Sequence, residues 1–399
     1  MVNRSLRKWI TRGVWFTVIF VLFFFVMDKF ERSPITHSEL KSFDSKSSVE
    51  TLSKSSLDYT DYTVRRLGLK PIPFVDPLQS DINEPVINDV LSFQYPVDID
   101  HKEKPKCRHW ANASLDSTNF TDANLNRTLL IVVISAVENF ARRHLIRQTW
   151  ASPHFVDVEW IQIIFLVGTT LFENQTIQDR LQKENVEYKD LVQVNVVDSY
   201  ANLTLKSIAL LHWAHGHCPG AQLVFKCDDD NYINWNVLSK ILPNLNDTRS
   251  IYGTPVPTLY AERWKKQKHY VSRRLWPWPR YPNYLLGGCY AIAGQAVKSL
   301  LAATQTTPLF WIEDIYLTGL CASKVNVSLQ SQPKYYYPDF PEKGQLNACF
   351  VRTTAIWQTR SSKHLAKSHK ITSKVYSHEL PCIPKSSRPV SKCFWGIFC

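Results

Sequence analysis

The sequence lacks several patterns that would place it in common protein classes. No G-x-G-x-x-G follows the first apolar strand pattern, at residues 129–136, so an NAD-binding domain loses its main support. No small-residue cleavage site follows the apolar run at residues 13–27, because the next residues are the charged and bulky DKFERS. Acidic residues are outnumbered, 35 against 47 Lys and Arg, and the formal charge of +12 raises the question of a nucleic-acid partner.

The uncharged run at residues 13–27 indicates a membrane instead. Basic residues precede it and the charges that follow roughly cancel, a bias that predicts a cytoplasmic N-terminus. The run is shorter than the about 20 residues of a typical spanning helix, and a cleaved signal peptide is the competing interpretation. We expect a cytoplasmic tail over residues 1–12, an uncleaved signal-anchor helix over 13–29, and the remainder across the membrane.

Glycosylation sequons support a lumenal address. Seven N-x-[ST] sequons follow the anchor, at Asn112, Asn119, Asn126, Asn174, Asn202, Asn246 and Asn326. Together they predict a single-pass type II protein of the Golgi membrane and argue against nucleic acid as a partner. Nine cysteines in an oxidising lumen should mostly pair, and Cys227, at the end of an apolar strand, is expected to be a buried thiol.

The hydrophobic pattern of the chain changes near residue 128. Residues 30–127 are polar, Ser-rich in part and poor in periodic pattern, which predicts a stem. Beyond them, β-branched apolar runs at 129–136, 161–168, 191–197 and 221–227 alternate with helical spacing at 138–150, 174–185 and 203–215. This alternation predicts an α/β domain over residues 128–360, with a mostly parallel sheet covered on both faces. A basic, Cys-containing tail is expected over residues 361–399.

Three adjacent carboxylates, Asp228, Asp229 and Asp230, end the fourth strand pattern. Ligands of open α/β sheets bind at the carboxyl ends of the strands. Because side chains alternate along an extended chain, we expect Asp228 and Asp230 on one face and Asp229 on the other. Carboxylate oxygens suit Mg²⁺, Mn²⁺ or Ca²⁺, and the spacing is wrong for an EF-hand. A solvated acidic turn is the alternative, which the position at a strand end disfavours.

Six elements, in order, resemble the motifs of one known family. They are RRHLIRQTW (142–150), FLVG (165–168), the segment 184–206 ending in DSYANLTLK, KCDDD (226–230), YVSRRLWPWPRYPNYLLGGCY (270–290) and EDIYLTG (313–319). From about residue 129 to 349 the chain resembles the β1,3-galactosyltransferase and β1,3-N-acetylglucosaminyltransferase family, glycosyltransferase family 31. The resemblance implies a GT-A-like fold with a nucleotide-binding half and an acceptor-binding half.

The resemblance also implies an activity. It predicts an inverting β1,3-hexosyltransferase that moves galactose, N-acetylglucosamine or N-acetylgalactosamine from a UDP-sugar to an acceptor glycan on protein or lipid, with Mn²⁺ or another divalent cation. By family position Asp230 is the metal ligand, while Asp228 and Asp229 lie near the ribose and the donor sugar. A sugar hydroxyl needs a base to take its proton, and the resemblance assigns that role to Asp314, with Glu313 orienting its neighbours. Capping of a helix is the alternative for Asp314.

Further site residues come from the same motifs. Arg143 and Arg147 lie four apart, hence on one helix face, and are expected either to bind the UDP-sugar or to pair with surface carboxylates. The loop before EDIYLTG is expected to form the acceptor side of the active site, through Trp278, Tyr284 and Gly287.

The chain departs from the family pattern at two places. Cys289 stands where the family has the second Gly of its loop, and Trp357 and Gln358 stand where a His often completes the metal site. These departures are the best support for an alternative function, a catalytically inactive lectin-like or chaperone-like Golgi membrane protein of the same fold. A type II adhesion or receptor ectodomain is a third hypothesis, against which the ordered nucleotide-site motifs argue.

Overall fold

The computed structural model describes most of the chain beyond residue 53. The described residues are 54–78, 84–99, 107, 128–152, 160–172, 174–331, 336–338, 340–341 and 346–382. The predicted signal-anchor and the sequons at Asn112, Asn119 and Asn126 lie outside them. No described helix is both long enough and apolar enough to cross a membrane. The chain divides into two compact units: of the described residues, 261–279 belong to one and all others to the larger one.

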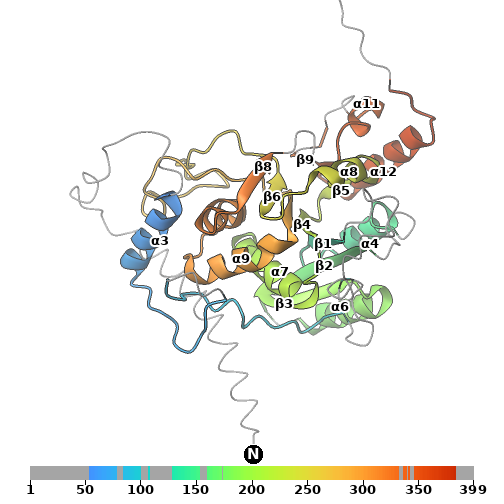
Figure 1. The fold of residues 1–399 in the computed structure, drawn as a ribbon. Coiled ribbons are helices and arrows are strands. Elements are labelled where there is room, and N and C mark those ends of the chain that lie inside the picture. Colours follow the sequence, from blue (N-terminus) through green and yellow to red (C-terminus); the bar gives the residue numbers. More distant parts are fainter. Residues whose placement is uncertain are drawn as a thin grey trace, which may run out of the picture. The chain divides into compact units, whose positions relative to one another are not determined.

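A seven-stranded sheet forms the centre of the larger unit (Figure 1). Its strands, in sheet order, are β3 (Leu191–Val197), β2 (Ile161–Thr169), β1 (Leu129–Ile134), β4 (Leu223–Asp228), β7 (Cys289–Ala293), β6 (Ser250–Gly253) and β8 (Ser328–Ser331). β1, β2, β3 and β4 are mutually parallel, and β7 runs antiparallel to both β4 and β6. The four predicted strands and the mostly parallel sheet are therefore confirmed.

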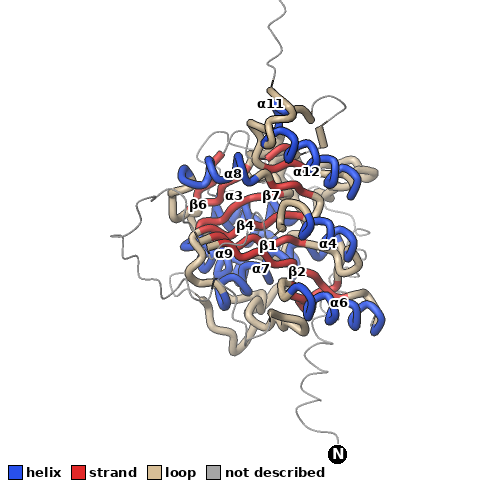
Figure 2. Tube along the Cα trace, turned by 90° about the vertical axis from the view of Figure 1, so that its right-hand side faces the viewer, coloured by secondary structure: helices blue, strands red, loops and turns tan. Residues whose placement is uncertain are grey.

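Helices cover both faces of this sheet. All six residues of β1 are buried, as expected of a central strand in a covered parallel sheet. α7 (Leu203–His217) and α9 (Gly294–Thr306) lie on one side, and α4 (Phe140–Gln148) and α6 (Gln175–Tyr188) on the other (Figure 2). α4, α6 and α7 fall on the three stretches in which helical spacing predicted helices.

A small second sheet brings the C-terminal part of the domain to the acidic strand end. Its strands are β5 (Asn231–Ile233), β10 (Ile356–Gln358) and β9 (Tyr336–Tyr337), in that order. β5 follows the three aspartates directly, and Gln358 pairs with Asn231 in the antiparallel β5–β10 register. α8 (Trp235–Ile241), η3 (Leu242–Asn244), α11 (Ala348–Val351) and α12 (Ser362–Tyr376) complete this region.

The predicted end of the domain at residue 360 is wrong. α12 begins at residue 362 and buries Leu365 and Val375 completely. Trp357 Nε1 donates to Ser368 Oγ at 2.9 Å, which fastens α12 to β10. The basic residues on the exposed side of this helix concealed its apolar face.

The predicted stem over residues 30–127 is also wrong in part. α3 (Lys54–Leu67) buries Tyr59, whose hydroxyl donates to the Leu309 carbonyl at 3.1 Å. Residues 84–99 run along the domain as an extended segment, with Val97 forming a bridge to Gln193 beside β3. The apolar residues that make these contacts are sparse and follow neither helical nor strand periodicity, so the pattern did not reveal them.

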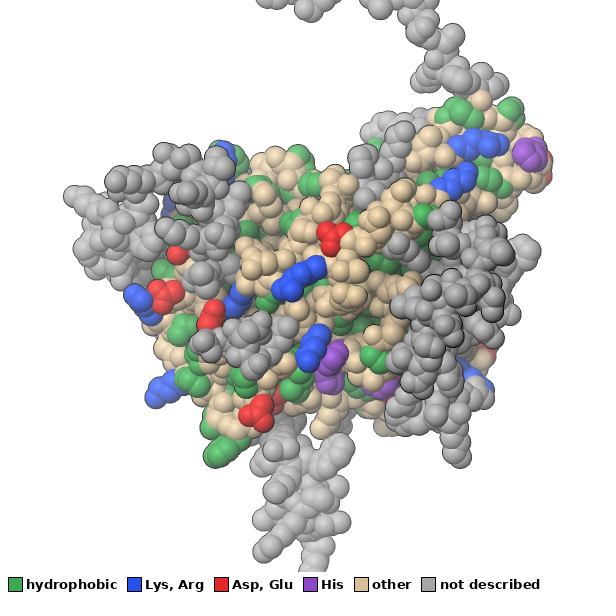
Figure 3. Space-filling model, viewed as in Figure 1, with side chains coloured by type: hydrophobic (Ala, Val, Ile, Leu, Met, Phe, Trp, Pro, Cys, Tyr) green, Lys and Arg blue, Asp and Glu red, His purple; other side chains and the backbone are tan. Residues whose placement is uncertain are grey.

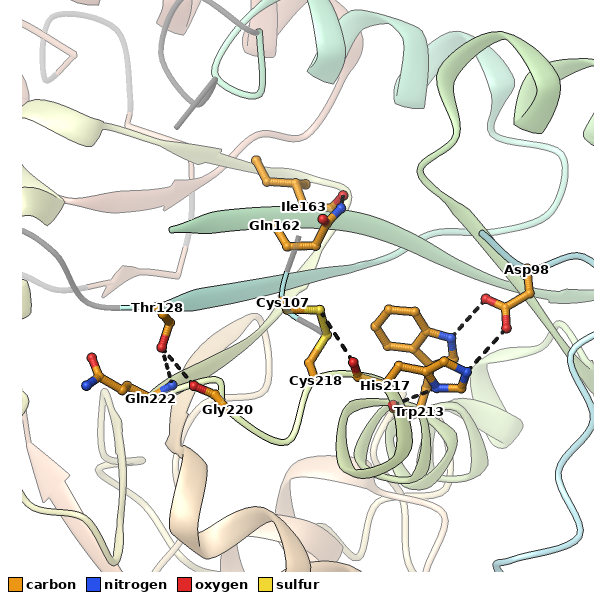
Figure 4. Close-up of a disulfide and its surroundings, with 10 residues drawn as sticks. All are labelled: Asp98, Cys107, Thr128, Gln162, Ile163, Trp213, His217, Cys218, Gly220 and Gln222. Carbon is orange, nitrogen blue, oxygen red and sulfur yellow. Dashed lines mark hydrogen bonds and ion pairs between the residues drawn. A yellow bond between two sulfur atoms is a disulfide. The ribbon is translucent and has the colours of Figure 1, made fainter. Parts of the chain in front are cut away.

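Two disulfides among the described residues fasten chain segments to the core. Cys107–Cys218 attaches the segment before β1 to the end of α7, and beside it Trp213 and His217 stack at 4.7 Å and both contact Asp98 (Figure 4). Cys349–Cys382 joins α11 to the residues after α12. Cys227 is a buried thiol, as predicted.

The described charges are mixed on the face that Figure 3 shows. Lys and Arg side chains are interspersed there with Asp and Glu and with neutral groups.

Candidate active site

The three aspartates lie where the central strands end. Asp228 is the last residue of β4, and its backbone N–H donates to the Gly288 carbonyl at 2.9 Å. The Asp229 N–H donates to the carbonyl of Ile134, the last residue of β1, at 3.0 Å. The backbone of the acidic run is therefore fixed between β1 and the start of β7.

The three carboxylates have different partners. Asp228 Oδ1 lies 2.6 Å from Lys226 Nζ. Asp229 Oδ2 accepts from Ser135 Oγ at 2.7 Å and from Asn139 Nδ2 at 2.8 Å. Asp230 Oδ2 accepts from Gln358 Nε2 at 2.6 Å. Asp229 thus points to the β1–α4 connection, away from the partners of its two neighbours.

Two of these carboxylates are harder to ionise than an ordinary aspartate. Burial raises the pKa of Asp228 to about 7, against the attraction of Lys226, and Asp230 raises it further. Its Oδ1 is buried although 31% of the side chain is exposed. Burial also raises the pKa of Asp230, and the hydrogen bond from Gln358 opposes that rise. A cation near these groups would stabilise both ionised forms.

The contacts of Arg143 and Arg147 favour pairing with carboxylates over binding of the UDP-sugar. The pairs are buried, not at the surface as expected. The Arg143 side chain is 0% exposed and makes two hydrogen bonds with Glu184, at 2.7 and 2.8 Å. Arg147 contacts the same Glu184 at 2.8 Å and both carboxylate oxygens of Asp190 at 2.7 and 2.8 Å. The Arg143 guanidinium is thus enclosed by partners within the fold, which favours a structural role for this residue.

Arg142, which sequence reasoning did not single out, lies closer to the acidic run. Its Nε donates to the Asp229 carbonyl at 2.9 Å, and its Nη2 donates to the Thr359 carbonyl at 2.8 Å. Thr359 in turn donates from Oγ1 to the Asp230 carbonyl at 2.8 Å. Arg142 therefore holds the acidic run and β10 together. Sequence alone could not separate two adjacent arginines at the start of a helix.

The D-x-Y-x-N-L-T-x-K motif is structural. Asp198 Oδ2 accepts from the N–H of Val137 at 2.7 Å and of Gly168 at 3.0 Å, while Oδ1 pairs with Lys206 Nζ at 2.5 Å. Asn202 is only 8% exposed and its Nδ2 donates to the Val197 carbonyl at 2.8 Å. The nitrogen that would carry a glycan at Asn202 is thus bonded within the fold, which argues against the predicted glycosylation of this residue. The other described sequons, at Asn174, Asn246 and Asn326, are exposed.

A second acidic group, Glu313 and Asp314, directly precedes the π-helix η4 (Ile315–Cys321). Asp314 Oδ1 accepts from the Ile315 N–H at 3.0 Å, so the carboxylate does cap this helix. Its other oxygen, Oδ2, faces Gly287: a Cβ at that glycine would lie 3.3 Å from Asp314 Oδ2 and 3.3 Å from Glu313 Oε2. The loop approaches both carboxylates closely enough to favour glycine, and capping leaves Oδ2 available for chemistry.

Burial and the neighbouring Glu313 raise the pKa of Asp314 to about 6. Glu313 itself is almost completely buried, and its Oε1 accepts from the Tyr290 hydroxyl at 2.6 Å. Only Asp314 of the two is partly exposed. One carboxylate of the pair is thus partly exposed while the other is held by its neighbours, and the roles assigned to Asp314 and Glu313 stay predictions.

Two tyrosines lie within electrostatic range of Asp314. Burial and the Asp314 charge raise the pKa of Tyr284, one of the predicted acceptor-side residues. Burial, Asp314 and Asp228 raise the pKa of Tyr200 to about 12, which places Tyr200 near both carboxylate sites. Tyr200, missed in the sequence, is 45% exposed and meets Trp311 edge-on at 6.1 Å. Its position two residues after Asp198, in the same quoted motif, was the available signal.

Trp278 belongs to the unit formed by residues 261–279. Within that unit it meets Trp276 edge-on at 4.9 Å, and its carbonyl accepts from Arg263 Nη2 at 2.6 Å. Its assignment to the acceptor side stays a prediction.

The two departures from the family pattern have clear structural positions. Cys289 begins β7, buried opposite Cys227 in the β4–β7 register, so it does not belong to the closely packed part of the loop. The close approaches are made by Gly287 and by Gly288, where a Cβ would lie 1.9 Å from the Tyr336 hydroxyl. Gln358 reaches Asp230 directly. Among the described residues, no group of three His, Cys, Asp or Glu side chains could hold a metal.

Comparison with known proteins gives consistent matches. Residues 141–333 match the family model described as Galactosyltransferase. Lactosylceramide 1,3-N-acetyl-beta-D-glucosaminyltransferase of Homo sapiens is 31% identical over 261 residues, 60% of this chain and 63% of that protein. Beta-1,3-galactosyltransferase 5 of Homo sapiens is 31% identical over 228 residues, 56% of this chain and 71% of that protein. N-acetyllactosaminide beta-1,3-N-acetylglucosaminyltransferase 2 of Mus musculus is 29% identical, over 64% of each chain.

Proposed function

Since the chain belongs to the family of β1,3-galactosyltransferases and β1,3-N-acetylglucosaminyltransferases, we propose that it is an inverting, UDP-sugar-dependent β1,3-hexosyltransferase. It moves galactose, N-acetylglucosamine or N-acetylgalactosamine to the 3-hydroxyl of a glycan on protein or lipid. The observation that carries this proposal is a carboxylate, Asp314, with one oxygen held by a helix N–H and the other facing the Gly287 loop.

Asp314 has the properties of a general base. Catalysis by proton transfer is most efficient when the pKa of the base lies near the working pH, and the pKa of Asp314 is raised to about 6 by burial and Glu313. In the proposed single displacement, the acceptor oxygen forms a bond to the anomeric carbon as the bond to UDP breaks. The leaving UDP takes the electron pair, and Asp314 Oδ2 takes the hydroxyl proton.

The acidic strand end fits a hard divalent cation. Asp228 and Asp230 supply carboxylate oxygens with raised pKa values, and the Gln358 amide lies within hydrogen-bond distance of Asp230. We assign Asp230 as the protein ligand, with Asp228 and Asp229 near the ribose and the donor sugar. When bound, Mn²⁺ or a similar ion would neutralise the charge of the departing diphosphate. Asp229, fixed by Ser135 and Asn139, would hold its orientation whether or not a donor is present.

The proposed address is the Golgi membrane, with a type II anchor at residues 13–29 and the catalytic domain in the lumen. The disulfides Cys107–Cys218 and Cys349–Cys382 support an oxidising compartment. The sequons support the same side of the membrane.

Transfer itself is the direct test of the proposed function. The purified lumenal part should release UDP from UDP-galactose, UDP-N-acetylglucosamine or UDP-N-acetylgalactosamine when a panel of glycan acceptors is present, and NMR of the product should show a β1,3 linkage. Release with one donor only would identify the donor sugar. If no donor and acceptor pair gives UDP, although UDP binds, the protein is a binding module of the same fold.

Burial predicts which sequons carry glycans. Asn174, Asn246 and Asn326 should be occupied because they are exposed, and Asn202 should not, because its Nδ2 is bonded to Val197. Peptide-N-glycosidase converts an occupied Asn to Asp, so peptide mass spectrometry of the treated protein identifies each site. A glycan at Asn202 would contradict the observed packing, and none at the three exposed sites would contradict the lumenal address.

A further inference from the structure

β4 carries a lysine at a position where an apolar side chain is expected. Lys226 lies in the run LVFKCD, and its side chain is 0% exposed. Burying an ammonium group is costly unless it is paired and hydrogen-bonded. The partners of Lys226 therefore indicate why the strand keeps it.

Those partners come from both sides of the proposed active site. Lys226 Nζ lies 2.6 Å from Asp228 Oδ1 and donates to the Gly287 carbonyl at 2.5 Å. It lies 3.7 Å from Glu313 Oε2. One ammonium group thus contacts the acidic strand end, the loop that faces Asp314, and the residue before Asp314.

Tyr290 completes this arrangement from the neighbouring strand. It is paired with Lys226 in the antiparallel β4–β7 register, and its ring centroid lies 5.8 Å from Lys226 Nζ. The Tyr290 hydroxyl donates to Glu313 Oε1 at 2.6 Å, so the two carboxylate oxygens of Glu313 face Tyr290 and Lys226. Both strands therefore hold the peptide segment that carries Asp314.

A second buried lysine shows what simple charge pairing looks like in the same chain. Lys324, with a 4% exposed side chain, lies 2.5 Å from Glu84 Oε2 and donates to the Thr306 carbonyl at 3.0 Å. These contacts fasten the start of the extended segment 84–99 to the end of α9 without involving Asp228 or Asp314. Lys226 differs because each of its contacts belongs to the site.

We infer that Lys226 is a positioning residue of the transfer reaction, holding the donor-side carboxylate Asp228 and the base-side residues Gly287 and Glu313 in a fixed relation. The inference rests on the proposed function. Its ammonium group contacts both sides, which keeps the distance between Asp314 and the donor sugar constant.

The charge of Lys226 also affects the pKa of Asp314, an effect that an uncharged packing residue would not have. Burial and Glu313 raise the pKa of Asp314, Lys226 lowers it, and Tyr284 and Tyr200 face it as neutral groups. A base must be ionised, so kcat/KM falls as the pH drops below the pKa of Asp314. Loss of the ammonium raises that pKa and moves the acid limb of the pH profile to higher pH.

The test compares three variants with the wild-type lumenal protein. Lys226→Met should shift the acid limb upward by about one pH unit, and should lower kcat/KM at the optimum by about 10²-fold through misplacement. Lys226→Met with Glu313→Gln removes one buried anion together with the cation, so it should recover thermal stability and return the acid limb toward wild type. Its kcat/KM should stay below that of Glu313→Gln alone, because Asp228 still lacks its partner. Lys324→Met is the matched control, with lower stability and an unchanged acid limb.

The outcomes separate this inference from the proposed function. An inactive wild type with every donor and acceptor contradicts the function itself. With an active wild type, the inference is overturned if Lys226→Met keeps the wild-type acid limb and kcat/KM. It is also overturned if the double variant regains full kcat/KM, because Lys226 would then only balance charge. The double variant decides the question even where Lys226→Met alone does not fold.

Discussion

Asp314→Asn is expected to lower kcat about 10²- to 10⁴-fold, which is the usual contribution of a general base. The substitution keeps the size of the side chain and its Oδ1, which accepts from the Ile315 N–H at 3.0 Å. The cap of η4 therefore survives, and only the ability to take a proton is lost. Binding of the UDP-sugar should be preserved, because the acidic strand end is unchanged. Single-turnover kinetics and calorimetric titration with the donor measure the two properties separately.

Glu313→Gln is the matched comparison for this prediction. Glu313 is buried between Tyr290 and Lys226, so Glu313→Gln should reduce stability. It should lower kcat less than Asp314→Asn does. An Asp314→Asn enzyme that binds donor and turns over within a few-fold of wild type would show that Asp314 serves only as a cap. A larger loss with Glu313→Gln would move the base to the neighbouring carboxylate.

The parts of this protein that sequence predicted best are those with strong local signals. The strands from Leu129 to Asp228 are near-continuous apolar runs, and such runs between helical stretches specify a covered parallel sheet. The acidic run could be placed at a strand end for the same reason. The motif around Asp314 could be located but its environment could not, because Gly287 and Tyr290 approach it from another part of the chain.

The contacts that sequence could not supply all involve distant partners. Gln358 meets Asp230, 128 positions away, because the two three-residue strands β5 and β10 pair. Strands so short have no readable alternation. Lys226 looks like a single outward-facing residue in an apolar strand until the loop at Gly287 covers it. Arg147 could face a ligand or a carboxylate with equal chemical sense, and only the fold brings Glu184 and Asp190 to it.

Asp230→Ala is the other change with a large expected effect, because it removes the carboxylate assigned to the cation. The charge of the leaving diphosphate would lose its neutralisation, which contributes several kcal/mol to the transition state, or about 10²- to 10³-fold in rate. In wild type, excess chelator should abolish transfer and added Mn²⁺ should restore it. In Asp230→Ala, calorimetric titration of Mn²⁺ with UDP should show weakened binding of the pair, a readout that does not depend on turnover.

The environment of Asp230 decides how this experiment must be controlled. Gln358 Nε2 bonds to Asp230 Oδ2 at 2.6 Å, and Thr359 donates to its carbonyl, so part of any loss could come from a displaced β10. Gln358→Ala removes the same hydrogen bond while leaving the carboxylate, and should therefore weaken Mn²⁺–UDP binding less than Asp230→Ala does. Asp179→Ala, on the exposed side of α6, should match wild type. Near-normal activity of Asp230→Ala, or full wild-type activity in excess chelator, would show that transfer proceeds without a cation at this carboxylate. Equal losses from Asp230→Ala and Gln358→Ala would instead assign the effect to the Asp230–Gln358 hydrogen bond, since that bond is the one feature that both substitutions remove.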